Sequence, residues 1–282
     1  MSKTSSSVKN RYAAKAYDRI SVFVPKGQKE LLQQAADRAG ESINTYVNQA
    51  ILNRMGLPAW PQKSKENEEE EKMEQWVYPC LPLRAETFPA ADDPIWEKAP
   101  DMRLSVTETG DAPHLQTQVR AFYDPEARML YFRFDGEDDE AHSDYTRRDE
   151  PIYNQDVLEV FLCDAGDLHR YKEFEVSPFN VQFDADITYR APHDTIIGLS
   201  WDLALWRSET HYDEAKRRIS SVWAMPLSGF DHVPSPGERW RMNVYRIDHS
   251  ARGMELMAWS PTGEPNFHVP DRFGWIEFVK KE

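Results

Sequence analysis

The clearest alternation of apolar and polar positions lies at residues 154–162, a run rich in β-branched and aromatic side chains. At the two-residue period of a strand, Val157, Glu159 and Phe161 share one face, while Asp156 shares the other face with three aliphatic residues. Apolar side chains on both faces predict a central strand of a layered sheet. Glu159 then lies among apolar neighbours, where a carboxylate needs a partner, a metal or a bound ligand.

The rest of residues 77–282 is also expected to form strands. The run at 170–176 follows a cluster of turn-forming residues and predicts a hairpin with the first run. Residues 117–123 and 129–134 predict another hairpin. Later strands are expected at residues 180–189, 218–225, 241–247, 255–259 and 275–279. Many short strands with little helix indicate a mostly β domain, an antiparallel β-sandwich over residues 77–282.

The first 56 residues show a different pattern, one strand followed by two helices. Residues 19–24 alternate, and Leu and Ala then recur at helical spacing up to Gly40, a natural helix stop. Ser42 is a good N-cap for a second helix, whose apolar residues recur as far as residue 51. A unit this small cannot bury its apolar faces alone, so we expect it to dimerise through its strand.

The charge of the chain is divided unevenly between these two parts. Residues 57–76 are polar and acidic, have little to bury, and are expected to be a linker. The formal net charge is −14, but residues 1–56 carry nine Lys and Arg against four Asp and Glu, which leaves about −19 for the rest. Only the basic N-terminal domain is therefore suited to nucleic acid, because the acidic remainder would repel phosphate.

The sequence favours a cytoplasmic location and no membrane partner. Its polar first residues lack the apolar run of a signal peptide, and no stretch approaches the roughly 18 apolar residues that span a bilayer. The two cysteines, Cys80 and Cys163, are too few for a disulfide framework.

Two segments, DRISVFVPKGQKELL at residues 18–32 and GESINTYVNQAI at residues 40–51, resemble the ribbon-helix-helix family of Arc-type repressors. The resemblance implies a homodimer whose paired strands enter the major groove of double-stranded DNA. It also implies that the start of the second helix holds a phosphate. The DNA-binding candidates are Arg19, Ser21, Phe23, Lys26 and Ser42. Phe23 departs from the long polar or basic side chains usual in the family, and a dimerisation module with solvated basic residues is the alternative.

Several blocks within residues 80–280 carry a second resemblance. They are ADDPIW, RAFYD, LYFRF, DVLEVFL, YKEFEV, WRMNVYR, WSP and NFHVP. Their order and spacing resemble the family 9 carbohydrate-binding modules. This implies a β-sandwich shared with DOMON domains, saccharide binding in a cleft lined by aromatic rings, and the structural calcium that family members often carry. One departure is Val222, where many relatives place a glutamate.

Sugar recognition needs flat apolar faces for the ring and polar groups for its hydroxyls. Three of the nine tryptophans lie beside turns and are favoured, with core packing as the alternative. Asp156 and Glu159 could accept sugar hydroxyls or pair internally with an arginine such as Arg120 or Arg133, and His268 could be a structural residue. The carbohydrate-binding candidates are Arg147, Arg148, Tyr153, Asp156, Glu159, Trp201, Trp206, Asn243, Tyr245, Trp259 and His268.

The acidic loop before residue 154 offers calcium ligands in Asp138, Asp139 and Asp144, but it lacks the spacing of an EF-hand, and a solvated charged loop is the favoured interpretation. The sequence contains no nucleophile elbow, zinc-binding helix motif or phosphate-binding glycine loop. It therefore predicts non-catalytic saccharide binding, coupled in one hypothesis to operator binding by the N-terminal domain. The alternatives are a glycoside hydrolase or its accessory subunit, and a purely structural dimer.

Overall fold

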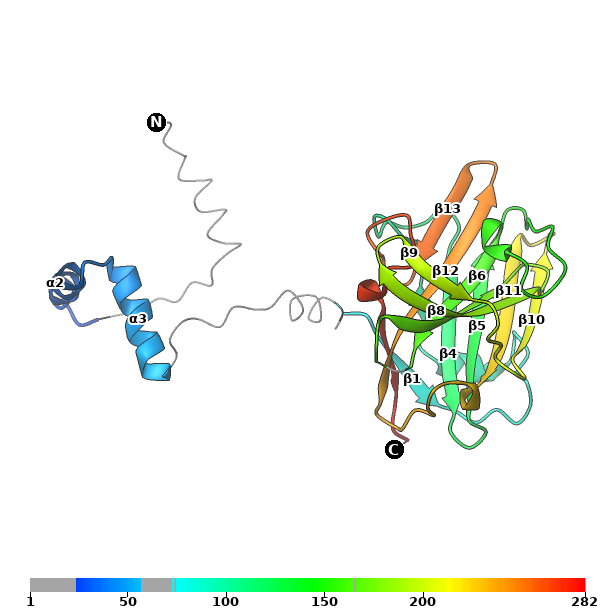
Figure 1. Ribbon diagram of the computed structural model, residues 1–282, viewed down its shortest axis with the longest axis horizontal. Helices are drawn as coiled ribbons and strands as arrows, with labels where there is room; N and C mark the ends of the chain where they lie inside the picture. Colours follow the sequence, from blue (N-terminus) through cyan, green and yellow to red (C-terminus); the bar gives the residue numbers. More distant parts are fainter. Residues whose placement is uncertain (1–23, 57–72, 74, 165, 282) are drawn as a thin grey trace. The chain divides into compact units, whose positions relative to one another are not determined.

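The computed structural model describes residues 24–56, 73, 75–164 and 166–281. The chain divides into two compact units, residues 1–63 and residues 64–282. The first contains helices and the second contains strands (Figure 1). Among the described residues, no helix combines the length and the apolar character needed to cross a membrane.

Both predicted N-terminal helices are present, as α2 (Lys29–Ala39) and α3 (Ile43–Met55). Gly40 and Gly56 end them in the left-handed conformation, each with a φ of 71°, which glycine adopts without a Cβ penalty. The Ser42 hydroxyl caps α3 by accepting a backbone N–H of the first turn. The helix boundaries follow from local sequence, as predicted.

The strand predicted at residues 19–24 lies outside the described residues, apart from its last residue. Three DNA-binding candidates fall in that stretch: Arg19, Ser21 and Phe23. Of the other two, Lys26 is exposed, and Ser42 already serves as a helix cap. The structure thus supports two N-terminal helices and gives no support to the ribbon-helix-helix assignment.

The second unit is a sandwich of two β-layers. One layer has the strand order β10 (Arg207–Asp213), β11 (Arg218–Pro226), β5 (Met129–Glu137), β4 (Thr117–Asp124). The other has the order β14 (Gly274–Phe278), β12 (Arg239–Ser250), β6 (Val157–Cys163), β7 (Arg170–Val176), β8 (Gln182–Ala191), β9 (Asp194–Gly198). The short strands are β2 (Met102–Arg103) beside β4, β13 (Gly253–Ala258) beside β12, and β3 (Ser105–Val106) beside β13. The 3-10 helices are η1 (Pro94–Lys98), η2 (Ile152–Asn154), η3 (Leu227–Gly229) and η4 (Pro270–Arg272).

Strand β1 (Val77–Pro82) joins the two layers. Residues 77–80 pair with β14 and residues 81–82 pair with β4, both in parallel. The other strand pairs among the described residues are antiparallel. The mostly β prediction is confirmed, but the sheet is mixed rather than purely antiparallel. The partners of β1 are distant in sequence, so no hairpin turn dictates its direction.

Strand β6 has the alternation that the sequence predicts, with all seven residues buried. Leu158 and Val160 pack between the layers. Val157 and Phe161 belong to a second apolar cluster on the outer face of their layer. Because β6 also lies between β12 and β7, it is a central strand, and its outer face places Glu159 among apolar side chains.

Candidate functional site

A cavity of about 230 Å³ lies on the outer face of β6 and β7. It is lined by Glu159 and Phe161 from β6, Glu173 from β7, and Phe267 and His268 from the loop that precedes β14. The remaining lining residues are Tyr153, Ile197, Ile247, Leu256, Pro265 and Asn266. Most of the wall is therefore apolar or aromatic, with two carboxylates among it.

A larger cavity of about 460 Å³ adjoins the first, since Leu256 and Pro265 line both. Several of its polar side chains are already bonded within the protein. Glu255 accepts the backbone N–H of His114 at 3.0 Å, and the Arg252 guanidinium lies 3.0 Å from the His114 ring. The smaller cavity has unpartnered carboxylates instead, so it is the stronger candidate site.

Three glutamates come together beside this smaller cavity, and two of them, Glu159 and Glu173, line it. The register of β6 and β7 places Glu175 directly opposite Glu159, and one carboxylate oxygen each of Glu159, Glu173 and Glu175 lies within 4.8 Å of the others. The three residues are 1%, 4% and 0% exposed, in that order. Among the described residues, one oxygen of Glu159, one of Glu173 and both of Glu175 have no hydrogen-bond partner. Burial raises the pKa of all three, and neighbouring carboxylates raise the pKa of Glu159 and Glu175 further.

The sequence singled out Glu159 but not Glu173 or Glu175. The signal was present, because alternate residues of the hairpin partner place Tyr171, Glu173 and Glu175 on one face. Whether that face is the one that carries Glu159 depends on the strand register, which the turn residues alone do not define.

Aromatic rings surround these carboxylates. The Phe161 ring lies 5.6 Å from Tyr171, 5.0 Å from Tyr245 and 5.3 Å from His268, measured between ring centroids. Phe267 stacks on Tyr245 at 4.1 Å. The Tyr171 hydroxyl is hydrogen-bonded to Nδ1 of His268 at 2.7 Å, which fixes the position of this candidate residue. The site therefore combines fixed ring faces with buried acids.

Asn243 and Tyr245 share one face of β12, as the sequence predicts, but their polar atoms are used internally. The Asn243 amide donates to the carbonyl of Ser260 at 2.8 Å and accepts its N–H at 2.9 Å. The Tyr245 hydroxyl donates to the carbonyl of Phe267 at 3.0 Å. These two candidates hold the loop that closes the cavity, and neither lines it.

Asp156 is also satisfied within the protein. Its two carboxylate oxygens accept the backbone N–H groups of His142 and His249, each at 2.7 Å. The expected arginine partners, Arg120 and Arg133, pair with other aspartates. Asp156 therefore anchors the acidic loop and lies outside the cavity.

The three tryptophan candidates lie away from the cavity. Trp206 and Trp259 are each 6% exposed and pack in the core between the layers. Trp201 is half-buried against the same core, with Nζ of Lys172 lying 5.0 Å from its ring centroid. Trp206 and Trp259 lie next to strand ends, where a large side chain can turn into the core. The turn residues in the sequence do not show which way such a side chain points.

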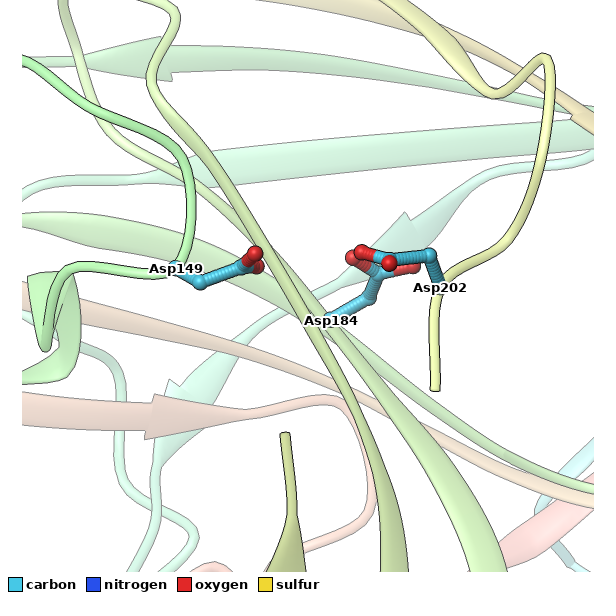
Figure 2. A group of neighbouring side chains, drawn as sticks. All are labelled: Asp149, Asp184 and Asp202. Atoms are coloured by element: carbon cyan, nitrogen blue, oxygen red, sulfur yellow. The ribbon is translucent and has the colours of Figure 1, made fainter. Parts of the chain in front are cut away.

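Arg148 lies in a second acidic cluster. Figure 2 shows the carboxylates of Asp149, Asp184 and Asp202 turned towards one another. The Arg148 guanidinium donates to Asp184 and, at 3.2 Å, to Asp202. Burial raises the pKa of Asp184 to about 6 although this cation opposes the shift. The cluster thus has a cation of its own, and Arg148 is engaged there.

The other two loop candidates differ in their placement. Arg147 is exposed and pairs with Glu150 at 2.8 Å. Tyr153 lines the cavity, is 37% exposed, and packs its ring edge-on against Phe183 at 5.5 Å. Tyr153 therefore offers an accessible aromatic face at the rim of the site.

The expected calcium ligands Asp138, Asp139 and Asp144 do not form a common site. Asp138 pairs with Arg246 at 3.0 Å, and Arg246 also binds Asp248 at 2.5 Å. Asp139 pairs with an arginine, and Asp144 accepts a glutamine amide. Among the described residues, the acidic groups close enough to share a metal ion are the glutamate cluster and the Arg148-bound aspartates.

The two-layered mixed sandwich carries carboxylates and aromatic rings in one cavity of its outer face, a concave and mostly apolar site of the kind that binds small ligands. Residues 90–281 match the carbohydrate family 9 binding domain-like family, and because this is more than half of the chain, the chain belongs to that family. The resemblance of the C-terminal blocks is thereby confirmed. The match begins at residue 90 and gives no support to DNA binding by the N-terminal helices.

Individual relatives agree with this assignment. An Arthroderma benhamiae "Extracellular protein" is 28% identical over 181 residues, 59% of this chain and 80% of the relative. A Bacteroides uniformis crystal structure has a TM-score of 0.57 at 17% identity, covering 72% of this chain and 97% of that one. A family 9 module of Caldicellulosiruptor kristjanssonii in complex with cellotriose has a TM-score of 0.53 at 14% identity, covering 73% and 95%. These two structural likenesses show the fold.

Proposed function

We propose that the sandwich binds a saccharide, without catalysis, in the cavity lined by Glu159, Phe161 and Glu173. The observation that carries this proposal is the presence of unpartnered buried carboxylates and aromatic faces in one cavity. Sugar hydroxyls donate to carboxylates, and the C–H face of a sugar ring packs on an aromatic ring. The cavity offers both kinds of contact.

The size of the cavity limits the ligand. Its volume of about 230 Å³ lies below the roughly 300–1,000 Å³ of sites for drug-sized molecules. We therefore infer that it takes one sugar ring, and that the adjoining cavity beyond Leu256 and Pro265 takes the next ring of a longer chain. The related Caldicellulosiruptor module was solved with glucose and with cellotriose, so these two sugars are the first probes.

Calorimetry on the full chain tests this proposal, with glucose, cellotriose and a panel of other saccharides titrated in calcium-containing buffer. Tyr153→Ala removes the accessible ring at the cavity and should weaken binding by about tenfold. Phe179→Ala is the matched control, because Phe179 is 55% exposed and does not line the cavity. A folded wild type that binds no saccharide, or equal binding by the two variants, would show that the proposal is wrong.

A second proposal concerns the N-terminal domain: we infer that it forms a homodimer and contacts DNA. The observation that supports the dimer is that Leu31 and Met55 are each 56% exposed, while Ala36 and Leu52 are the buried apolar residues of α2 and α3. Two helices of this size bury little apolar surface by themselves, and a second copy would supply the missing partner. Sedimentation of the full chain tests the dimer, which Leu31→Glu should dissociate.

DNA binding and its coupling to sugar need a separate experiment. Gel retardation with random and operator-like duplexes, at a fixed salt concentration, measures DNA affinity with and without a bound saccharide. Equal DNA affinity in both conditions would exclude a sugar-sensing regulator, since coupling requires a differential effect. A cytoplasmic location belongs to this proposal, and cell fractionation tests it.

A further inference from the structure

We propose that Glu159, Glu173 and Glu175 hold a divalent cation of the calcium type, and that the side of this ion facing the cavity binds two neighbouring sugar hydroxyls. The first half rests on the glutamates alone, and the second half rests on the saccharide site proposed above. The three carboxylates lie beside an apolar cluster with almost no exposure to water. Burying three such charges without compensation has a large free-energy cost.

The polar groups around the glutamates are already engaged. The Tyr245 hydroxyl donates to a backbone carbonyl, and the Tyr171 hydroxyl is bonded to His268. The Asn243 amide donates to Ser260 and to Tyr245. Among the ion pairs of the described residues, none includes any of the three glutamates. The nearby His268 opposes the rise in the pKa of Glu173, and the remaining compensation must come from protons or from a bound cation.

Protons compensate the cluster only in part. A proton shared between Glu173 and Glu175 would neutralise only one of the carboxylates. It leaves Glu159 directly opposite Glu175 on the neighbouring strand, and like charges in that position destabilise a sheet. An ion placed between the three carboxylates attracts all of them at once.

A sugar alone also satisfies only part of the cluster. Glu159 and Glu173 line the cavity, so hydroxyl groups can reach them. Glu175 does not line it, is 0% exposed, and has two unpartnered oxygens. An ion between the three glutamates contacts Glu175 behind the cavity wall and a ligand in front of it.

In two other acidic clusters of this protein, an arginine side chain neutralises the carboxylates. Arg148 donates to both Asp184 and Asp202, and Arg246 lies between two further aspartates. Within the described part of the chain, no lysine or arginine forms an ion pair with any of the three glutamates. This contrast makes the glutamates the better cation site.

The ligand set favours a hard cation. Calcium takes six to eight oxygens at about 2.3–2.6 Å, so two oxygens on one ion lie at most about 5 Å apart. The glutamate oxygens lie within 4.8 Å of one another, which is inside this limit. Three carboxylates fill about three to six positions, which leaves room on the cavity side for water or two hydroxyls. A set made only of carboxylates suits calcium, magnesium or manganese rather than zinc or copper.

Calorimetric titration of calcium chloride into the chelator-treated full chain tests the ion site. We expect one calcium ion per sandwich in the wild type and at least about tenfold weaker binding in Glu175→Gln, because losing a residue that only supports a metal ligand already weakens metal sites by about ten- to a hundredfold. Asp202→Asn is the matched control in the other acidic cluster and should bind normally. Terbium luminescence, sensitised by Tyr171 and Tyr245, is a second readout, and Glu173→Gln is the second variant if Glu175→Gln does not fold.

Each outcome supports or overturns the proposal. Absence of calcium and terbium binding in the wild type overturns it, as does calcium binding that survives Glu175→Gln and Glu173→Gln or is lost in Asp202→Asn. An amino sugar that binds without calcium and more tightly than glucose also overturns it, because the carboxylates then take an ammonium group.

Saccharide titrations with and without calcium separate this proposal from the saccharide site. Saccharide binding that calcium does not strengthen overturns the second half of the proposal and leaves the saccharide site intact. Calcium binding without any saccharide binding supports the ion site and shows that the proposed saccharide site is wrong.

Discussion

Glu159 on β6 and Glu175 on β7 lie directly opposite each other, both buried, and neither forms an ion pair with a described residue. The carboxylates are therefore held in place by the packing of the strands and not by bonds of their own. Anything that neutralises them in the folded state stabilises the fold by mass action, because the unfolded chain does not bring them together.

Glu175→Gln should change stability in opposite directions with and without calcium. In chelator at pH 8, removal of one unpaired buried charge should raise the free energy of unfolding by about 1–3 kcal/mol. In excess calcium the wild type should be the more stable of the two, because the variant lacks a ligand. Urea unfolding in both buffers measures this. Glu209→Gln, at an exposed position, should change stability by less than about 0.5 kcal/mol in either buffer, and a Glu175→Gln effect of one sign throughout would contradict the prediction.

Asp138 should make stability depend on pH. Burial raises its pKa from 3.8 to about 6 although Arg246 opposes the shift, and Asp248 and Asp156 add to it. The folded state therefore binds more protons than the unfolded state between pH 4 and 6. The contribution of Asp138 to the free energy of unfolding thus falls as the pH rises through that window. From pH 4 to pH 7, the free energy of unfolding of Asp138→Asn should therefore rise by on the order of 1–3 kcal/mol relative to that of the wild type.

Urea unfolding at a series of pH values measures this difference. Asp139→Asn is the control, because Asp139 is more exposed and its pair with Arg217 lies near the surface. A wild-type and Asp138→Asn difference that is constant across the pH series would rule out a titration at Asp138.

Tyr245→Phe should loosen the loop that closes the cavity. The variant loses the 3.0 Å hydrogen bond to Phe267 and leaves that carbonyl without this donor, at a cost of about 1 kcal/mol. Chemical denaturation measures the loss, and hydrogen exchange of residues 259–268 should locate it. Tyr189→Phe, at a half-exposed position, should be within about 0.5 kcal/mol of the wild type. Equal exchange in Tyr245→Phe and wild type would be the contrary result.

Gly274→Ala should be strongly destabilising. A Cβ at this position would lie 2.6 Å from the carbonyl oxygen of Trp76 and 2.7 Å from the ring of Trp259. Because the first is backbone and the second is packed in the core, relief needs a shift of strand β14, at a cost of about 3 kcal/mol or more. Gly253→Ala meets no atom within 4 Å and should pay only backbone strain of about 1–2 kcal/mol. A smaller loss for Gly274→Ala than for Gly253→Ala in urea unfolding would refute this.

The parts of the fold that the sequence predicts are those set by local pattern. Strand β6 is apolar on both faces, and the turn residues between β6 and β7 indicate their pairing. The polar strands β9 and β10 lack this alternation and were not predicted. Strand β1 was missed because its partners lie far away in the sequence, where no turn signal reaches.

The candidate site was predictable to a smaller extent. Glu159 was found because a lone carboxylate in an apolar strand needs an explanation. Asp156 looked similar, but its partners are backbone N–H groups that a sequence does not reveal. Trp206 and Trp259 lie beside strand ends, where rotation of one bond decides between core and surface, and the structure places both in the core.

Strand β1 also has a consequence for how the chain reaches its native state. Val77 pairs with Trp275, so this contact forms only after almost the whole sandwich has been synthesised. Pairings between such distant residues are slow, because the entropy of closing a long loop is lost before the contact stabilises anything. We therefore expect folding to be limited by the arrival of β14 beside β1. Until then residues 239–242 of β12 lack their partner strand on one edge, a short surface that would attract chaperones during synthesis.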